Sequence, residues 1–282
     1  MTTHQSLFED YELSDDLAFH APYREALLQL SLQDCERVLQ ALGPHASLLD
    51  DPGRAAFHRV LFTLSDVPAV SVTPGDFEAH RSARAGTSNP ESHLPDFWRS
   101  QIVNGHSAYV ANDNLHSGAV PGTPVWSFMR FGATYTHLPD GRWIAIGGEH
   151  EDHYDEDFCI YADVTVFDGH GGISHYIYPE DVFPPTDFHT ATLIGDVIWV
   201  IGSLGYPGQR HAGQTQVLCL DTGSFEMTKV ETSGTPPGWI NRHEAVLEGD
   251  QILISGGMLE PGWVANEKSF ALDLTTQVWR QI

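Results

Sequence analysis

A run of eleven residues, from Glu149 to Cys159, carries six carboxylates and two histidines, an unusual density of side chains that can hold a cation. Oxygen and imidazole donors of this kind bind Ca²⁺, Zn²⁺, Mn²⁺ or Fe²⁺. Their spacing matches neither a calcium-binding loop nor a His-Glu-x-x-His zinc motif. A solvated loop is the favoured interpretation, while a divalent-metal site and an acidic loop that recognises a basic partner stay open. The candidate binding residues of the run are Glu149, His150, Asp152, His153 and Asp155.

Two histidines stand at equivalent places, because His189 and His243 each precede a glycine of the repeat described below by 13 residues. Joined by Glu149 or His150, they would form a metal site with two histidines and one carboxylate, the type that holds non-haem iron. The favoured interpretation is structural: buried imidazoles need hydrogen-bond partners, and these would be loop backbone groups between neighbouring repeats. The metal hypothesis therefore names His189, His243, Glu149 and His150 as ligands of Fe, Zn, Mn or Ca.

Three further side chains are candidates for binding a partner. Arg242 is one of few cations in an acidic chain, and its place beside His243 makes it the cation that we most expect to contact a ligand. A structural ion pair is the favoured alternative. Trp239 and Trp263 are expected first as packing residues between repeats. If exposed, they would instead indicate a binding hot spot.

The charge of the chain restricts its partners. Its 282 residues include 38 acidic and 14 basic side chains, which gives a formal net charge of −24. Such a field repels nucleic-acid phosphates and anionic membrane surfaces, and it favours basic protein partners. We also find no phosphate-binding loop, dinucleotide fingerprint or Gly-x-Ser-x-Gly elbow. The composition thus predicts no nucleic-acid and no membrane partner.

The cysteines and the first residues indicate the compartment. Three cysteines without metal-type spacing make a disulfide framework improbable. The first residues lack the basic and apolar regions of a secretion signal, and no apolar run approaches the roughly 18 residues needed to cross a bilayer. We therefore expect a reduced, cytoplasmic protein.

The first part of the chain has mainly helical patterning. Residues 1–20 predict an extended arm, and residues 23–42 predict two helices separated near Ser31 to Asp34. A third helix is expected from Asp51 to Leu64, followed by a long loop over 66–93. A further helix starts near Leu94 and is interrupted by Gly105, and residues 106–111 could resume it.

From Pro124 the apolar period changes from helical to strand-like, and a strand ending in a glycine recurs. It ends at Gly147-Gly148, then after 55 residues at Gly202-Ser203, then after 54 at Gly256-Gly257. The pattern predicts four strands in each repeat. In the first repeat a strand over 125–131 precedes a hairpin around 139–141, a third strand at 159–167 and a fourth at 173–178.

These repeats resemble the kelch family of β-propellers, whose period is near 50 residues. The matching features are the glycine pairs, an aspartate that ends each third strand, and an aromatic residue in the fourth strand. They are carried by Gly147, Gly148, Gly202, Ser203, Gly256, Gly257, Asp168, Asp221, Asp273, Phe225 and Trp279. Residues 147–152 and 181–189 are also similar to compact bacterial kelch-like proteins of unassigned function, a similarity that implies no activity.

The resemblance implies a mainly β fold with kelch-type four-stranded blades at about 124–184, 185–237 and 238–282, after a helical N-terminal region at 1–120. Closed propellers carry four to eight blades, so three clear repeats imply a partial or small propeller. Three alternatives stay open: an irregular fourth blade within 65–130, an open propeller capped by the N-terminal helices, or two chains that combine as a homodimer. We favour helices from residues 20–115 packing on the first blade.

The function implied is that of a cytosolic kelch-like binding protein, which would recognise a protein partner through its propeller loops. The net charge suggests a basic partner. The alternative is a metal-dependent enzyme with a histidine–carboxylate site at the propeller channel, for which the iron-using, nitrile-forming kelch proteins of plants offer a loose analogy. Since one fold hosts many functions, the resemblance does not decide between them.

Overall fold

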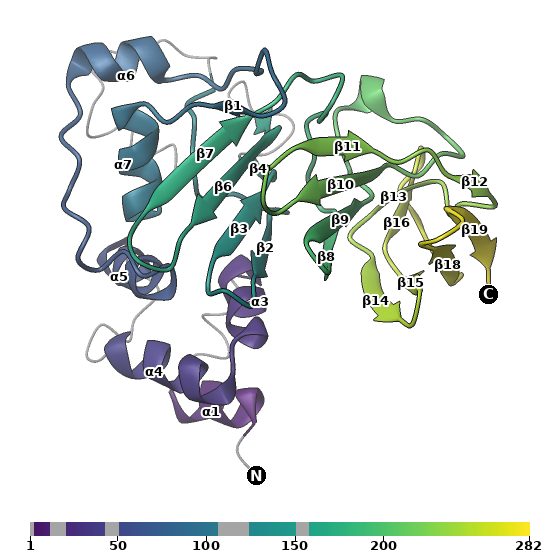
Figure 1. The fold of residues 1–282 in the computed structure, drawn as a ribbon, viewed down its shortest axis with the longest axis horizontal. Helices are drawn as coiled ribbons and strands as arrows, with labels where there is room; N and C mark the ends of the chain where they lie inside the picture. Colours follow the sequence, from purple (N-terminus) through teal and green to yellow (C-terminus); the bar gives the residue numbers. More distant parts are fainter. Residues whose placement is uncertain (1–2, 12–20, 43–50, 107–123, 151–157) are drawn as a thin grey trace.

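The structure is a computed structural model, and it describes residues 3–11, 21–42, 51–106, 124–150 and 158–282. The N-terminal helices lie at one end, three antiparallel sheets follow side by side, and the C-terminus lies beside the third sheet (Figure 1). A mainly β fold with N-terminal helices is therefore confirmed. Three candidate binding residues of the acidic run, Asp152, His153 and Asp155, fall outside the described residues.

Each sheet, which we call a blade, has four successive strands that pair antiparallel with their neighbours. The first strand of each blade lies on the inner edge, next to the first strand of the adjoining blade. Blade 1 contains β2 (Thr134–His137), β3 (Trp143–Ile146), β6 (Asp163–Phe167) and β7 (Ile173–Ile177). Blade 2 contains β8 (Thr190–Ile194), β9 (Val197–Ile201), β10 (Val217–Asp221) and β11 (Met227–Lys229). Blade 3 contains β14 (Glu244–Glu248), β15 (Gln251–Ser255), β18 (Phe270–Asp273) and β19 (Val278–Gln281).

Short strands extend or connect these blades. β1 (Glu91–Ser92) pairs with β7, and β12 (Ser233–Gly234) pairs with β19, so that blades 1 and 3 have five strands each. Two further small sheets lie in the connections between the long strands. They contain β4 (Glu149–His150) with β5 (Cys159–Ile160), and β13 (Trp239–Asn241) with β16 (Met258–Glu260) and β17 (Val264–Ala265).

The blades pack face to face through two apolar clusters. The cluster between blades 1 and 2 includes Ile144, Val164, Ile198 and Leu218, all at most 1% exposed. The cluster between blades 2 and 3 includes Ile201, Ile252, Ile254, Leu272 and Trp279. Because side chains alternate between the faces of a strand, each inner blade surface is apolar at every second position. Burial of these rows holds the three blades in contact.

Helices cover the other face of blade 1, as expected. A third apolar cluster joins them to that face through Phe57, Phe62, Trp98, Trp126, Tyr135, Trp143 and Phe167. Phe62 stacks on Phe167, with ring centroids 4.3 Å apart. The helices are α1 (His4–Asp10), α3 (Ala21–Gln29), α4 (Leu32–Leu42), α5 (Asp51–Leu61), α6 (Pro74–His80) and α7 (Asp96–Asn104). The helical region and blade 1 thus share one core.

Two helices lie where other structure was predicted. α1 occupies part of the predicted extended arm, and α6 interrupts the predicted loop over 66–93. Both begin with a capping box, at Thr3 and Thr73, which satisfies backbone N–H groups of the first turn. Phe77 of α6 is fully buried, and that burial offsets the weak propensity of a short helix. Gly105 ends α7 with φ 60°, and the resumption predicted over 106–111 falls almost wholly outside the described residues.

Two strand predictions in the first repeat were wrong. Residues 125–131 form an irregular segment with a single bridge, from Phe131 to Glu149, because Trp126 and Phe128 fill the core under the helices. The strand predicted over 159–167 is split into β5 and β6 at Tyr161. The Tyr161 carbonyl accepts a hydrogen bond from Thr186 N (3.0 Å) in the segment leading to blade 2, which takes it out of the ladder of blade 1.

A buried ion pair anchors the irregular segment to blade 1. The guanidinium of Arg130 donates from both terminal nitrogens to the carboxylate of Asp163, and both side chains are 5% exposed. Arg130 also donates to Ser127 O (2.7 Å) and Gly147 O (3.0 Å), and its guanidinium lies 3.3 Å from the ring centroid of Tyr161. Burial would raise the pKa of Asp163, but Arg130 and then His175 hold that pKa well below its usual range. The pair is therefore ionised, and each guanidinium nitrogen donates at least one hydrogen bond.

Candidate functional site

Two positions before each inner strand lies a residue with a left-handed backbone, and these residues connect the blades. They are Gly132, Phe188 and Arg242, with φ of 62°, 48° and 54°. Phe188 N donates to Gly132 O (2.8 Å), and Arg242 N donates to Phe188 O (2.8 Å). A left-handed conformation costs a residue with a side chain about 1–2 kcal/mol. Such strain, when held in place by its surroundings, is an established marker of functional positions.

Arg242, the last residue of this line, lies near two aromatic rings. Its guanidinium carbon is 3.3 Å from the ring centroid of Phe188 and 5.3 Å from that of Trp263. Burial lowers the pKa of the guanidinium, and the negative charges of Glu149 and Asp187 oppose that change. Arginine stays charged at neutral pH in any protein environment. The structure thus brings together three predicted binding residues, Glu149, Arg242 and Trp263.

Asp187 is a site residue that the sequence analysis missed. It is fully buried, and its Oδ1 accepts hydrogen bonds from Gly205 N (2.7 Å) and Ser203 Oγ (3.3 Å). Its Oδ2 makes no hydrogen bond of ordinary geometry within the described residues. The carboxyl groups of Asp187 and Glu149 interact electrostatically with each other. Burial raises the pKa of Asp187, and these donors together with Arg242 limit the rise. The result is a pair of interacting acids beside one cation.

Exposed aromatic side chains lie on both sides of this group. Phe131, in the irregular segment before blade 1, is 60% exposed, and its backbone exchanges two hydrogen bonds of 2.8 Å with Glu149. Trp263 is 50% exposed in blade 3, while Phe188 of the loop into blade 2 is half-buried. We call Phe131, Glu149, Phe188, Arg242 and Trp263 the rim surface. Trp239 does not belong to it, being 6% exposed with its indole N–H bonded to Leu204 O (2.9 Å).

The two repeat histidines lie between blades. His189 Nε2 is 2.8 Å from Thr134 Oγ1 of blade 1, and His243 Nε2 is 3.0 Å from Thr190 Oγ1 of blade 2. Each histidine is 6% exposed and pairs with the threonine that begins the preceding inner strand. The structural interpretation, that these imidazoles tie neighbouring repeats together, fits this geometry, although the partners are side chains.

The remaining metal candidate, His150, is also part of a structural network. Its Nδ1 lies 2.6 Å from the hydroxyl of Tyr161, which in turn accepts from Ser127 N (2.9 Å). The described residues contain no group of three or more histidines, cysteines and acids arranged to hold a metal ion. A metal site built with residues of the acidic run 151–157 therefore stays a prediction.

Buried histidines predict a loss of stability in weak acid. Burial lowers the pKa of His189 to about 3 and that of His243 to about 4. Below the unfolded-state pKa of about 6.5 the unfolded chain binds more protons than the folded one, so the free energy of unfolding falls as the pH falls. Each histidine should contribute up to about 1.4 kcal/mol per pH unit between pH 6.5 and its folded pKa.

Urea unfolding at a series of pH values between neutrality and pH 5 measures this slope. The variant His189→Gln should have a smaller slope than the unaltered chain, because one proton-binding site is removed from the unfolded state. The variant His211→Gln is the matched control, because it replaces an exposed histidine and keeps both buried imidazoles. Equal slopes in all three proteins would contradict the argument.

Comparison with known proteins gives a limited match. No family model matches the chain. A stretch of 71 residues is 30% identical to human Kelch domain-containing protein 3, which corresponds to 25% of this chain and 18% of that protein. No helix within the described ranges is long and apolar enough to span a membrane. Together with the four-stranded antiparallel blades, this similarity supports a kelch-like character of the repeat region.

Proposed function

We propose that this chain is a protein-interaction module and that the rim surface is its contact site. The observation that carries the proposal is the guanidinium of Arg242, which lies near the rings of both Phe188 and the exposed Trp263. The exposed Phe131 joins the same surface through the backbone of Glu149. Tryptophan and arginine are enriched among residues that dominate protein–protein binding energy. Exposed aromatic groups beside a polar cluster are typical of such surfaces.

The backbone of the rim favours binding without rearrangement. Phe188 and Arg242 are held in left-handed conformations by hydrogen bonds that cross between blades, so their side chains are positioned before a partner arrives. Preorganisation of this kind reduces the conformational entropy lost on association. The kelch-like repeat region, similar over a short stretch to a kelch-domain protein, is consistent with an interaction role.

The charge of the chain indicates the nature of the partner. The whole chain has a formal net charge of −24, and Glu149 and the buried Asp187 lie beside Arg242, the one cation of the rim surface. Long-range attraction would accelerate association with a basic protein. We therefore propose a basic partner whose association slows as ionic strength rises.

Alanine at Trp263 tests the rim. The unaltered chain, the variant Trp263→Ala and a control Val278→Ala are immobilised, and retained cell proteins are compared by quantitative mass spectrometry. Val278 is 38% exposed on the outermost long strand of blade 3, so its variant controls for loss of an exposed apolar side chain. A rim partner should be retained by the control and lost by Trp263→Ala, with affinity lowered about 30-fold or more once measured with the purified partner.

Two results would contradict the proposal. One is a partner that binds Trp263→Ala and the unaltered chain with equal affinity, which would move the contact site elsewhere. The other is an association rate independent of salt, which would remove the argument for a basic partner.

A further inference from the structure

Blade 2 differs from its neighbours at its outer edge. In blades 1 and 3 a fifth strand pairs with the outermost long strand, β1 on β7 and β12 on β19. Within the described ranges no strand pairs with the outer side of β11. Unpaired edges invite pairing with another chain unless they are covered. The edge of β11 is therefore a candidate surface for strand addition.

The ladder between β10 and β11 shows which backbone groups face outward. Asp221 N donates to Glu226 O (3.0 Å) and Val230 N donates to Val217 O (2.9 Å), so Glu226 and Val230 face β10. Because the direction alternates along a strand, the N–H and C=O groups of Met227, Lys229 and Glu231 point away from it. These three residues form the open edge.

The first of the three is already paired by a side chain. Asn89 Nδ2 donates to Met227 O (2.8 Å), and Met227 N donates to Asn89 Oδ1 (2.9 Å). One amide side chain thus makes both hydrogen bonds that a neighbouring strand would make. Lys229 and Glu231 have no such partner, since their backbone groups make no hydrogen bond in the part of the chain that the structure describes.

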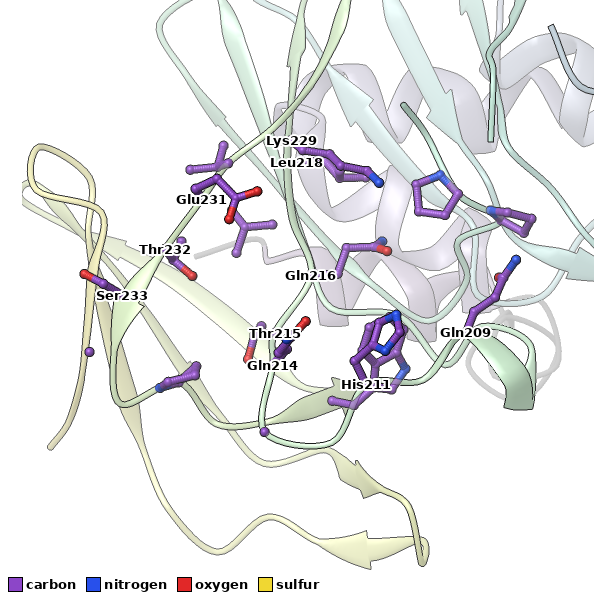
Figure 2. A pocket seen from close by; sticks show the side chains of 18 of the residues that line it. Gln209, His211, Gln214, Thr215, Gln216, Leu218, Lys229, Glu231, Thr232 and Ser233 are labelled. Carbon is purple, nitrogen blue, oxygen red and sulfur yellow. The ribbon is translucent and has the colours of Figure 1, made fainter. Parts of the chain in front are cut away.

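The two unpaired residues line a cavity of about 720 Å³. Figure 2 shows Lys229, Glu231 and Gln216 where β11 ends and β10 begins. His211 lies across the cavity from Glu231. Pro184, Pro185, the exposed Glu180, Ser233 and Trp239 also line it. The cavity is therefore lined by residues of the open edge together with amide, hydroxyl, proline, carboxylate and ammonium groups.

We propose that this edge binds an extended, basic peptide segment of a partner protein by strand addition to β11. The unpaired N–H and C=O groups repeat at alternate residues, which is the spacing that an added strand matches. The chain itself fills the corresponding edge of blades 1 and 3 with its own extended segments. The two carboxylates of Glu180 and Glu231 outnumber the one ammonium group of Lys229 in the cavity, and with the net charge of −24 they favour a basic over an acidic peptide.

This site is separate from the rim surface and does not depend on the function proposed for it. The edge lies on the outermost strand of blade 2, whereas the rim lies beside the inner strands. Substitution of Trp263 should leave peptide binding at the edge unchanged, so failure of one proposal is distinguishable from failure of the other.

Proline at Lys229 tests the edge. The substitution Lys229→Pro removes an outward N–H that takes no part in the ladder, and prolines are tolerated at such edge positions. The control Lys229→Ala retains the N–H and loses the same charged side chain. The probe is an acetylated, fluorescently labelled peptide of alternating lysine and valine, with an expected dissociation constant on the order of 0.1 mM for so few main-chain bonds.

We expect Lys229→Pro to weaken binding of the probe at least about 10-fold, and Lys229→Ala to bind it at least as tightly as the unaltered chain. Peptides N-methylated at alternate amides provide a second test on the unaltered protein, in case the proline variant does not fold. Methylation in one register should abolish binding, while methylation in the other should not, because only one set of amides faces β11.

Hydrogen exchange locates the bound peptide, since the amides of Lys229 and Glu231 should become protected. Three results would each overturn the proposal: equal affinities for the two Lys229 variants, equal tolerance of both methylation registers, or no binding at about 1 mM peptide. Protection confined to the rim surface would assign the peptide to that surface and equally exclude the edge.

Discussion

Alanine at Gly147 is expected to lower the free energy of unfolding by about 2–5 kcal/mol, whereas alanine at Gly256 should cost only about 1–2 kcal/mol. The two glycines hold the same place in blades 1 and 3, with φ of 57° and 62°. Both substitutions therefore carry the same cost of a left-handed backbone. They differ in what the added methyl group meets.

At Gly147 an added Cβ would lie 2.2 Å from the carbonyl oxygen of Thr186 and 3.5 Å from the ring of His189, both in the segment leading into blade 2. At Gly256 it would meet no atom of the described chain within 4 Å. Glycine at this repeat position is needed for close approach of the next blade, and blade 3 has no described blade beyond it. The difference between the two costs thus measures the packing of blade 2 on blade 1.

Chemical denaturation of the two alanine variants and the unaltered chain checks this comparison. Gly202→Ala should resemble Gly147→Ala, because its Cβ would lie 2.5 Å from Ile240 O and 2.6 Å from the ring of His243. If Gly256→Ala lowers the free energy of unfolding as much as Gly147→Ala does, the outer face of blade 3 is not exposed. If that loss also depends on protein concentration, a second chain covers this face.

On its outer face, blade 3 carries polar residues at two positions where blade 2 carries apolar ones. Ile194 and Ile201 of blade 2 pack against blade 3, and the positions equivalent to them in blade 3 are Glu248 and Ser255. Terminal units of repeat arrays carry polar outer faces, which keep them soluble. At the opposite end, the helices cover blade 1 instead. The described blades thus have helices over one side, and Glu248 and Ser255 on the exposed side of the third blade.

Patterns within a few residues predicted the blades well. The strands before Gly147, Gly202 and Gly256 alternate or run apolar, and each is preceded by a turn, so their places in the sheets follow from local sequence. The same local pattern failed over 125–131, where alternating apolar residues serve a core built by the helices. Burial in three dimensions, rather than period, determines the conformation of that segment.

The site was less predictable, because its contacts join distant parts of the chain. Glu149 was selected for its charged surroundings, whereas Asp187 was one acid among many until burial and the N–H of Gly205 made it distinct. The pairing of Asn89 with Met227 spans 138 residues and has no local signal. The open edge beyond Met227 could therefore be recognised only once the sheets were arranged.

The buried pair of Arg130 and Asp163 predicts the other large effect on stability. Arg130→Met should lower the free energy of unfolding by about 3–5 kcal/mol, because it leaves the carboxylate of Asp163 buried without its cation. Asp163→Asn should cost a similar amount, since it leaves the guanidinium uncompensated. In Arg130→Met, Trp126 Nε1 and His175 Nε2 would still lie 3.2 and 3.5 Å from Asp163 Oδ2. These two groups cannot replace the charge and the hydrogen bonds that Arg130 supplies.

The double variant separates the charge pair from its surroundings. If the cost of each single variant is mainly an unpaired buried charge, Arg130→Met with Asp163→Asn should cost less than the sum of the two single variants by at least about 2 kcal/mol. Additive costs would instead show that each side chain acts through its other contacts, such as those of Arg130 with Gly147 O and the ring of Tyr161. Gly147 also packs against Thr186, in the segment that leads into blade 2. The double-mutant comparison would then measure how far Arg130 stabilises the packing of blade 2 on blade 1 through Gly147.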